Sequence, residues 1–196
     1  KKSDSREAVM ENFSRFCRAI GVEPGNMVFS DQIHGDQIAV VGENDRGKGI
    51  FRNTDIIGKD GLMTCQPGVA LVTFYADCVP LFFLDPVYPA IAVSHAGWRG
   101  TVAKIGAKTL AMMEKAFGTR PEDCLVGIGP SIGPCCFEVD IPVMEQFAAA
   151  FPKHRYIIKN GRKPNKYNID LWQANTMELI EMGVPKDNIS LASICT

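Results

Sequence analysis

Two apolar segments near the middle of the chain, joined by five residues, constrain its fold more than any other feature. Residues 79–84 and 90–95 are continuous apolar runs, which is typical of buried β-strands. Their connection, residues 85–89, contains Pro86 and Pro89 and is too short for a parallel crossover. The pattern therefore predicts an antiparallel hairpin inside a β-sheet.

An amphipathic helix is predicted close to the start of the sequence. Phe13 and Phe16 belong to a set of apolar residues at helical spacing, and Asp4 with Glu7 offers a start that resembles a capping box. Cys17 falls on the apolar side of this helix, so we expect it to pack in the core.

Helices and strands alternate along the remainder of the chain. Further helices are predicted over residues 101–117, 140–151 and 170–182. Further strands are predicted over residues 26–30, 37–41, 69–75, 124–128 and 189–194. Residues 42–61 are polar and rich in glycine, so they are predicted to form a long surface loop. This order predicts the α/β (α+β) class: a layered sandwich of mixed β-sheet with flanking helices, in a single domain over residues 1–196.

Composition excludes several classes of protein. Twenty-one basic and twenty-two acidic residues give a net charge of -1, which argues against a nucleic-acid-binding protein. The longest apolar runs, residues 69–75 and 79–84, are far shorter than a membrane span, and the first residues lack the apolar core of a signal peptide. We therefore expect a cytoplasmic protein with no membrane partner, whose seven cysteines are free thiols or metal ligands rather than disulfides.

Histidine is scarce, and two of the three histidines, His34 and His95, lie near the ends of predicted strands and shortly before a glycine. Side chains at such positions reach into sites rather than into the core. Folding the hairpin brings Cys78, just before its first strand, beside His95 at the end of the second. The third histidine, His154, lies in a charged segment and is expected to be solvated.

A thiol beside an imidazole allows three interpretations. Cys78 and His95 can form a nucleophilic pair, in which the imidazole lowers the pKa of the thiol. Together with His34 they can instead bind a metal, because one Cys and two His leave the open fourth position of a catalytic zinc site. The third interpretation is a buried cysteine and a hydrogen-bonded histidine that are neighbours by chance.

Arg99 and a nearby turn are candidate contacts for an anion. Arg99 lies at the predicted start of a helix, where it can clamp a phosphate or carboxylate, or form a surface ion pair. Residues 129–134 form a turn rich in Gly and Pro that can present amide groups to an anion or simply connect two elements. Cys135 and Cys136 follow this turn, and as neighbours they are expected to point in different directions, one of them into the core. No CxxC spacing occurs, so a structural zinc ribbon has no support.

Several motifs resemble those of the laccase-domain family, whose members are also described as purine nucleoside phosphorylases or peptidoglycan editing factors. The matching motifs occupy residues 31–35, 60–62, 66–68, 76–80, 95–100 and 129–139, with weaker matches at residues 170–172 and 195–196. The resemblance spans nearly the whole chain, and the order of the motifs makes it specific.

The resemblance implies a layered α/β fold with a zinc ion held by His34, Cys78 and His95, which form the catalytic group. It implies phosphorolysis of adenosine, inosine and 5′-methylthioadenosine, so that the partners are a purine nucleoside and phosphate, with adenosine deamination as a further reaction. Arg99 is the expected substrate-binding residue, because it can hold the phosphate.

The resemblance also raises two further expectations. Asp77 and Glu138 are both candidates to move protons during deamination. Family members carry an Arg-Gly-Gly-containing segment before the first helix and a Phe-Phe-Ser-x-Arg segment after the final strand. Residues 1–196 contain neither, so the sequence is expected to be a domain that lacks these N- and C-terminal segments.

The laccase name implies copper, but three histidines are too few for a blue-copper centre and a trinuclear cluster together. Copper can still occupy the group of His34, Cys78 and His95, and we expect such binding to be adventitious. Two other functions stay open: a metal-free Cys–His hydrolase or amidase acting on a cell-wall precursor, and a non-enzymatic interaction module.

Overall fold

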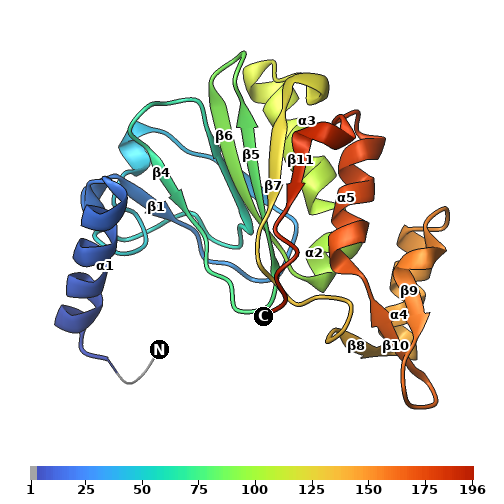
Figure 1. Ribbon diagram of the computed structural model, residues 1–196. Coiled ribbons are helices and arrows are strands. Elements are labelled where there is room, and N and C mark those ends of the chain that lie inside the picture. The colour runs from blue at the N-terminus through green and yellow to red at the C-terminus, as the bar shows by residue number, and fades with distance from the viewer. Residues whose placement is uncertain (1–3) are drawn as a thin grey trace.

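The structure, a computed structural model, describes residues 4–196 and confirms the layered α/β class, because helices cover one face of a mixed six-stranded sheet (Figure 1). The order across this sheet is β11-β7-β5-β6-β3-β2. Its strands are β2 (Ile38–Val40), β3 (Gly61–Thr64), β5 (Val79–Asp85), β6 (Ala90–Ala96), β7 (Leu125–Ile128) and β11 (Ile189–Leu191). Pairs β2–β3 and β7–β11 are parallel, and the other neighbours are antiparallel.

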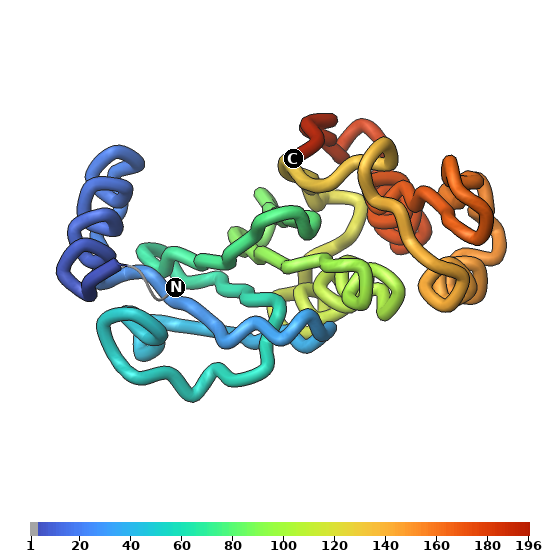
Figure 2. The backbone as a smooth tube through the Cα atoms, turned by 90° about the horizontal axis from the view of Figure 1, so that it is seen from below, coloured from blue at the N-terminus to red at the C-terminus, as the bar shows by residue number. Residues whose placement is uncertain are grey.

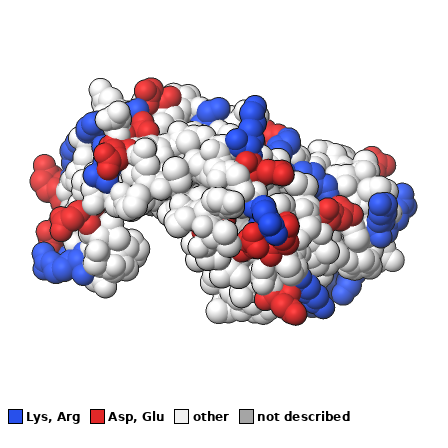
Figure 3. Space-filling model, turned by 90° about the horizontal axis from the view of Figure 1, so that it is seen from above, with Lys and Arg blue, Asp and Glu red and all other residues white. Residues whose placement is uncertain are grey.

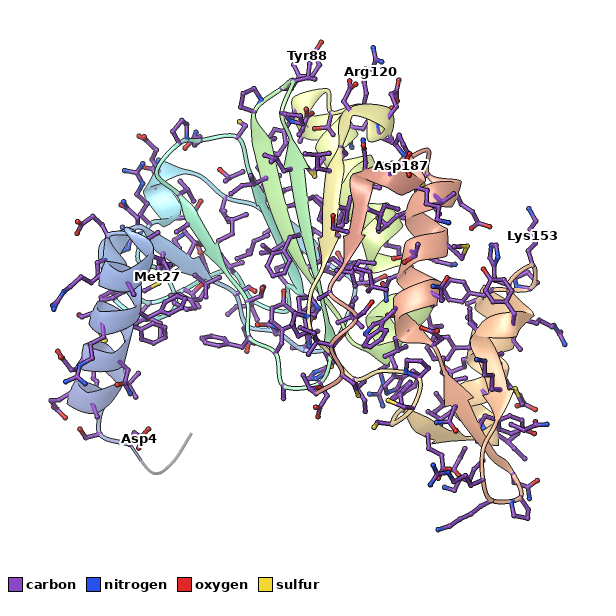
Figure 4. All side chains as sticks on the ribbon, in the orientation of Figure 1. Asp4, Met27, Tyr88, Arg120, Lys153 and Asp187 are labelled. Atoms are coloured by element: carbon purple, nitrogen blue, oxygen red, sulfur yellow. The ribbon has the colours of Figure 1, made fainter. Side chains whose placement is uncertain are left out.

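The predicted hairpin is confirmed as β5 and β6 at the centre of the sheet. Its register runs from Val79 opposite Ala96 to Asp85 opposite Ala90, so Pro80 rather than Cys78 lies directly opposite His95. Side chains alternate between the faces of a strand, and a difference of two residues therefore leaves Cys78 on the same face as His95. The hairpin turn, marked by Tyr88 in Figure 4, lies at the end of the sheet away from the C-terminus.

Three helices cover one face of the sheet: α2 (Trp98–Val102), α3 (Ile105–Phe117) and α5 (Leu171–Glu181). The predicted helix over residues 170–182 is confirmed, but the predicted continuous helix over residues 101–117 is wrong. Lys104 has a φ of 62°, which is the left-handed conformation, and it separates α2 from α3. Helical spacing detects the apolar side of both helices but not a break between them.

A smaller layer covers part of the opposite face. β1 (Met27–Phe29) and β4 (Ala70–Val72) pair in parallel, and buried Val28 joins a core cluster with Leu62 of β3 and Val93 of β6. The predicted strand over residues 69–75 is thus shorter than expected. This second layer gives the domain its sandwich, with β3 and β6 between the helices and the β1–β4 pair (Figure 1).

The second layer does not extend over β5 and β7, and the expectation that the apolar runs are buried on both faces is wrong there. Phe82 and Leu84 of β5 and Leu125 of β7 are exposed, whereas alternate residues of β5 such as Leu81 are fully buried under the helices. A strand with one face against helices and one in solvent needs only alternate apolar residues, so composition alone overestimates its burial.

The first helix, α1 (Arg6–Ile20), begins at Ser5, whose side chain accepts a hydrogen bond from the Ala8 amide at 3.2 Å. The expected cap at Asp4 is therefore wrong. Cys17 packs in the core, as predicted, with its sulfur 3.5 Å from that of Met27, which Figure 4 shows beside the helix. Phe16, by contrast, is exposed, so only a narrow stripe of α1 is buried.

Two parts of the chain carry strands that the sequence patterns did not indicate. A three-stranded sheet, β8 (Glu138–Asp140), β10 (Lys166–Ile169) and β9 (Ile158–Asn160), flanks α4 (Ile141–Ala150), which confirms the helix predicted over residues 140–151. The predicted loop over residues 42–61 ends in β3 and contains buried Ile56 and Asp60, so it is not simply a surface loop. Strands of three or four residues are too short to show a clear period.

The distribution of charged side chains on the surface is consistent with the near-neutral net charge. Basic and acidic side chains are interspersed over the face seen in Figure 3, without a large area of one sign.

Within residues 4–196, no helix is long and apolar enough to cross a membrane.

Candidate functional site

His34, Cys78 and His95 meet near the point where β6 ends and the chain leads into α2. Figure 1 shows these two elements. His34 lies in the loop between β1 and β2, Cys78 directly precedes β5, and His95 is in β6. One ligand atom from each lies within 4.8 Å of the others, and the centroids of the two imidazole rings are 4.7 Å apart. The structure therefore brings together the three side chains that the sequence pattern selected.

The backbone around this group leaves room for the three side chains. A Cβ atom on Gly97 would lie 3.1 Å from Cys78 Sγ and 3.4 Å from the His34 ring, which explains a glycine directly after β6. His34 itself has a φ of 63°, a conformation that is uncommon for residues other than glycine. Strained residues of this kind persist where surrounding contacts hold them, and they cluster at functional sites.

The contacts that hold His34 come from Asp60, which is fully buried just before β3. Its carboxylate accepts hydrogen bonds from the backbone amides of Ile33, His34 and Gly35 at 3.2, 2.9 and 2.7 Å. The same carboxylate lies 2.8 Å from His95 Nδ1. Asp60 therefore fixes both the loop that carries His34 and the orientation of the His95 ring.

These hydrogen bonds decide the charge of both partners. Burial alone would raise the pKa of Asp60, but the hydrogen bonds from His95 and from three amides outweigh it and lower that pKa. Burial of the His95 ring opposes protonation, yet the contacts with Asp60 and Cys78 raise its pKa to about 9. Because an ionised carboxylate only accepts hydrogen bonds, Asp60 keeps a proton on His95 Nδ1, so that Nε2 is the atom that can donate to a substrate when protonated or bind a metal once its proton is released.

Asp60 was not among the site residues predicted from the sequence. The acidic residues predicted to move protons were Asp77 and Glu138, both of which are exposed. Asp77 Oδ1 accepts a hydrogen bond from Thr196 at 2.9 Å, and Glu138 lies on β8 opposite Asn168. The available signal for Asp60 was an acidic residue placed directly before a short apolar segment, at the end of a polar loop.

The donor set could hold a metal ion. One thiolate and two imidazoles suit zinc and copper, and three protein ligands leave a position open for another molecule. The contact between Asp60 and His95 supplies the outer carboxylate that accompanies most metal-binding histidines. The interpretation of chance neighbours leaves this carboxylate and the strained backbone of His34 unexplained.

Arg99 lies in α2, four residues after His95, and is exposed. Its guanidinium group is over the Trp98 ring, with Cζ 4.3 Å from the ring centroid. Within residues 4–196 it forms no salt bridge, so the alternative of a surface ion pair is not observed. The guanidinium is exposed, and its role as an anion contact stays a prediction.

Two predictions about other thiols and histidines are wrong. Cys135 and Cys136 are both exposed, because they lie in a turn rather than in a strand, where neighbours would point to opposite faces. His154 is half-buried, and its Nε2 is 2.9 Å from Glu181 Oε1, so it is paired rather than simply solvated.

Comparison with known proteins agrees with this fold. Residues 1–196 match the family described as multi-copper polyphenol oxidoreductase laccase. The chain is 34% identical over 194 residues to a Geobacillus stearothermophilus protein named purine nucleoside phosphorylase YlmD, covering 98% of this chain and 71% of that protein. It is 34% identical to adenosine deaminase RL5 from an unknown prokaryotic organism, covering 90% of this chain and 68% of that protein. The crystal structure of the Bacillus licheniformis hypothetical protein YfiH superposes with a TM-score of 0.93 at 33% identity, covering 98% of this chain and 73% of that one.

Proposed function

We propose that this chain, which belongs to the multi-copper polyphenol oxidoreductase laccase family, is a zinc-dependent purine nucleoside phosphorylase that also deaminates adenosine. Adenosine, inosine and 5′-methylthioadenosine are the proposed nucleosides, and phosphate is the second substrate. The names of two relatives support these reactions, and the group formed by His34, Cys78 and His95 supplies a site for them.

The observation that carries the proposal is the contact between Asp60 and His95 within reach of Cys78 and His34. The two imidazoles and the thiolate would hold zinc, with Asp60 fixing the orientation of His95. When bound, zinc supplies a Lewis acid that polarises an oxygen atom at neutral pH. Three protein ligands would leave a fourth position for substrate or water.

Phosphorolysis requires a bound phosphate below the sugar. A phosphate oxygen forms a bond to ribose C1′ while the bond from C1′ to the purine nitrogen breaks, which gives the free purine and ribose 1-phosphate. Positive charge develops on the sugar in such reactions. Arg99 is proposed to hold the phosphate, because its guanidinium is exposed, lacks a carboxylate partner within the described chain, and follows His95 by four residues.

Deamination requires a group that carries protons. Water adds to C6 of adenine, the C6–N bond breaks, and ammonia leaves. Both Asp77 and Glu138 are exposed, and Asp77 is the better candidate for this role because it directly precedes Cys78. Asp60 is unsuited to it, since its oxygens are occupied by three amides and His95.

One observation favours a second candidate function. The contact between Cys78 and His95 helps to raise the pKa of the imidazole, as in a thiolate–imidazolium pair that attacks an amide carbonyl. A metal-free hydrolase or amidase of this kind would keep its activity in the presence of a strong chelator, whereas the zinc enzyme would lose it and recover it when zinc is restored.

The main test uses purified protein with adenosine and phosphate, and measures adenine, ribose 1-phosphate and inosine. Cys78→Ala removes a proposed zinc ligand. Loss of an outer-shell partner typically lowers activity by about 10- to 100-fold, and we expect both activities to fall by more than this. Metal analysis of the same samples is expected to show zinc in the wild type and its loss in the variant.

Cys65→Ala is the matched control, because Cys65 is another free cysteine with an accessible side chain, but it follows β3 at the opposite end of that strand from Asp60. It is expected to keep full activity and zinc content. The proposal fails if the wild type forms no product, or if Cys78→Ala is as active as Cys65→Ala.

A further inference from the structure

A second group of metal-ligating side chains lies outside the site described above. Cys135, Cys136 and Cys195 place their sulfur atoms within 4.8 Å of one another, and the sulfurs of Cys135 and Cys195 are 3.5 Å apart. All three residues are exposed. Two of them come from one turn, and the third comes from the C-terminal segment, 60 residues later.

The backbone fixes the position of the third cysteine. Residues 131 and 195 form a parallel bridge, in which the Ser131 amide donates to the Ile194 carbonyl at 3.1 Å and the Thr196 amide donates to the Ser131 carbonyl at 3.3 Å. Figure 2 shows the C-terminal end of the chain lying beside the segment near residue 131. The approach of Cys195 to the other two thiols is therefore part of the fold.

Gly133 makes the close approach possible. Its amide donates a hydrogen bond to Cys195 Sγ at 3.2 Å, which favours the thiolate form of that sulfur. A Cβ atom at this position would lie 2.9 Å from the Trp172 ring and 3.3 Å from Cys195 Cβ, so a larger residue would push the two segments apart. Trp172 is held in turn by a hydrogen bond from its Nε1 to Ser131 Oγ at 2.8 Å. The three thiols are thus held before any ligand arrives.

The donor types indicate which ligand suits this arrangement. The group contains three sulfurs and no imidazole or carboxylate. Thiolates are soft ligands that select Cu(I), zinc or iron–sulfur clusters, and structural zinc and these clusters use four protein ligands. We propose that Cys135, Cys136 and Cys195 form a three-thiolate binding site for Cu(I).

This site is separate from the group of His34, Cys78 and His95, but it lies close to it. Thr196, the neighbour of Cys195, donates a hydrogen bond to Asp77 Oδ1 at 2.9 Å, and the Ile132 amide donates to the Asp77 carbonyl at 2.8 Å. Asp77 directly precedes Cys78. Cu(I) binding at the three cysteines does not depend on the proposed nucleoside chemistry.

The test titrates the reduced protein with Cu(I) under anaerobic conditions, against a coloured Cu(I) chelator as competitor. Cys78→Ser serves as the parent protein, because it removes the soft ligand of the first site. We expect this parent to take up one equivalent of Cu(I), with an ultraviolet absorption typical of Cu(I)–thiolate bonds. Adding Cys195→Ser is expected to abolish the uptake, whereas adding Cys65→Ser leaves it unchanged.

A second measurement on the wild-type protein does not depend on the folding of any variant. After Cu(I) is added, alkylation by N-ethylmaleimide is mapped by mass spectrometry, and we expect protection of the three cysteines but not of Cys65. Equal uptake in the Cys195→Ser and Cys65→Ser proteins would overturn the proposal. So would alkylation of all three thiols at the same rate with and without Cu(I), or a Cys135–Cys195 disulfide in a protein that takes up no Cu(I) after reduction.

Discussion

Two buried carboxyl groups in different parts of the molecule show how differently the same chemical group is used. Asp60, beside His95, is 0% exposed, and Glu178 of α5, which faces Gly106 of α3, is 1% exposed. Burial raises the pKa of both, because a charge is less stable away from water. The final pKa values nevertheless move in opposite directions.

The difference lies in the number of donors around each carboxylate. Asp60 receives three backbone amides and the His95 ring, and these together lower its pKa. Glu178 Oε1 receives one amide, from Gly106 at 3.0 Å, and Oε2 has no hydrogen-bond partner within residues 4–196. Burial therefore dominates at Glu178 and raises its pKa to about 8, although the charge of Lys104 acts in the opposite direction. A buried carboxyl group therefore stays charged only where the fold supplies enough hydrogen-bond donors.

The largest effect is expected from removing the charge of Asp60. Asn at this position keeps one acceptor oxygen but leaves at least one of the amides of the His34 loop without a partner. We expect Asp60→Asn to lower the free energy of unfolding by about 3 kcal/mol at pH 7. Urea unfolding followed by circular dichroism measures the loss.

The pH dependence of this loss of stability tests whether Asp60 is ionised in the folded protein. The pKa of Asp60 is lower in the folded protein than its ordinary value of 3.8, so its contribution is present above pH 3.8 and declines as the pH falls through the folded-state value. The stability difference between wild type and Asp60→Asn should accordingly be constant between about pH 5 and 6, and it should shrink as the pH rises from 6.5 toward 9, because the contact with Asp60 that raises the pKa of His95 then stops contributing to stability. A difference that grows steadily between about pH 5 and 6 would show that Asp60 is not held ionised.

A smaller effect is expected on the chemistry of the site. Asp60→Asn removes the carboxylate that orients His95, and loss of such an outer partner of a metal ligand typically costs about 10- to 100-fold in metal affinity or activity. Zinc affinity, measured by competition with a chelator, is the direct readout. Asp60→Glu, which keeps the charge, is expected to recover part of the affinity. Unchanged affinity in Asp60→Asn would mean that His95 is not a zinc ligand.

The sequence predicted the hairpin and the grouping of His34, Cys78 and His95 because these depend on local patterns. Two apolar runs and a five-residue connection determine β5 and β6, and the positions of Cys78 and His95 follow from that hairpin. The two-residue difference in register did not matter, since it preserved the face. His34 could be predicted for another reason: the chain has only three histidines, so few residues could serve as the second imidazole.

The supporting residues could not be predicted in the same way. Asp60 contacts His95 because Gly61 of β3 pairs with Ser94 of β6, and this pairing joins segments more than thirty residues apart. Cys135 and Cys195 meet through a bridge between residues 131 and 195. Contacts of this kind are set by the order of strands in the sheet, which no local period records. The same reason explains the exposed side chains of Phe82 and Leu84, since their burial depends on how far the second layer extends.

The smallest effect on the metal-binding group is expected from neutralising the second carboxyl group, in Glu178→Gln. The folded-state pKa of Glu178, about 8, is above the ordinary value of 4.5, so the folded chain keeps a proton that the unfolded chain loses between these pH values. Wild-type stability from this group is therefore present below pH 4.5 and is lost as the pH rises to about 8. Gln does not titrate, and it still accepts the Gly106 amide, although its NH₂ group gains no acceptor. We expect the variant to match the wild type near pH 4.5 and to become progressively more stable than the wild type as the pH rises to 8, with unchanged zinc affinity. A variant that is less stable at pH 8 than at pH 4.5, relative to the wild type, would show that Glu178 is ionised and paired in the folded protein, and the contrast with Asp60 would disappear.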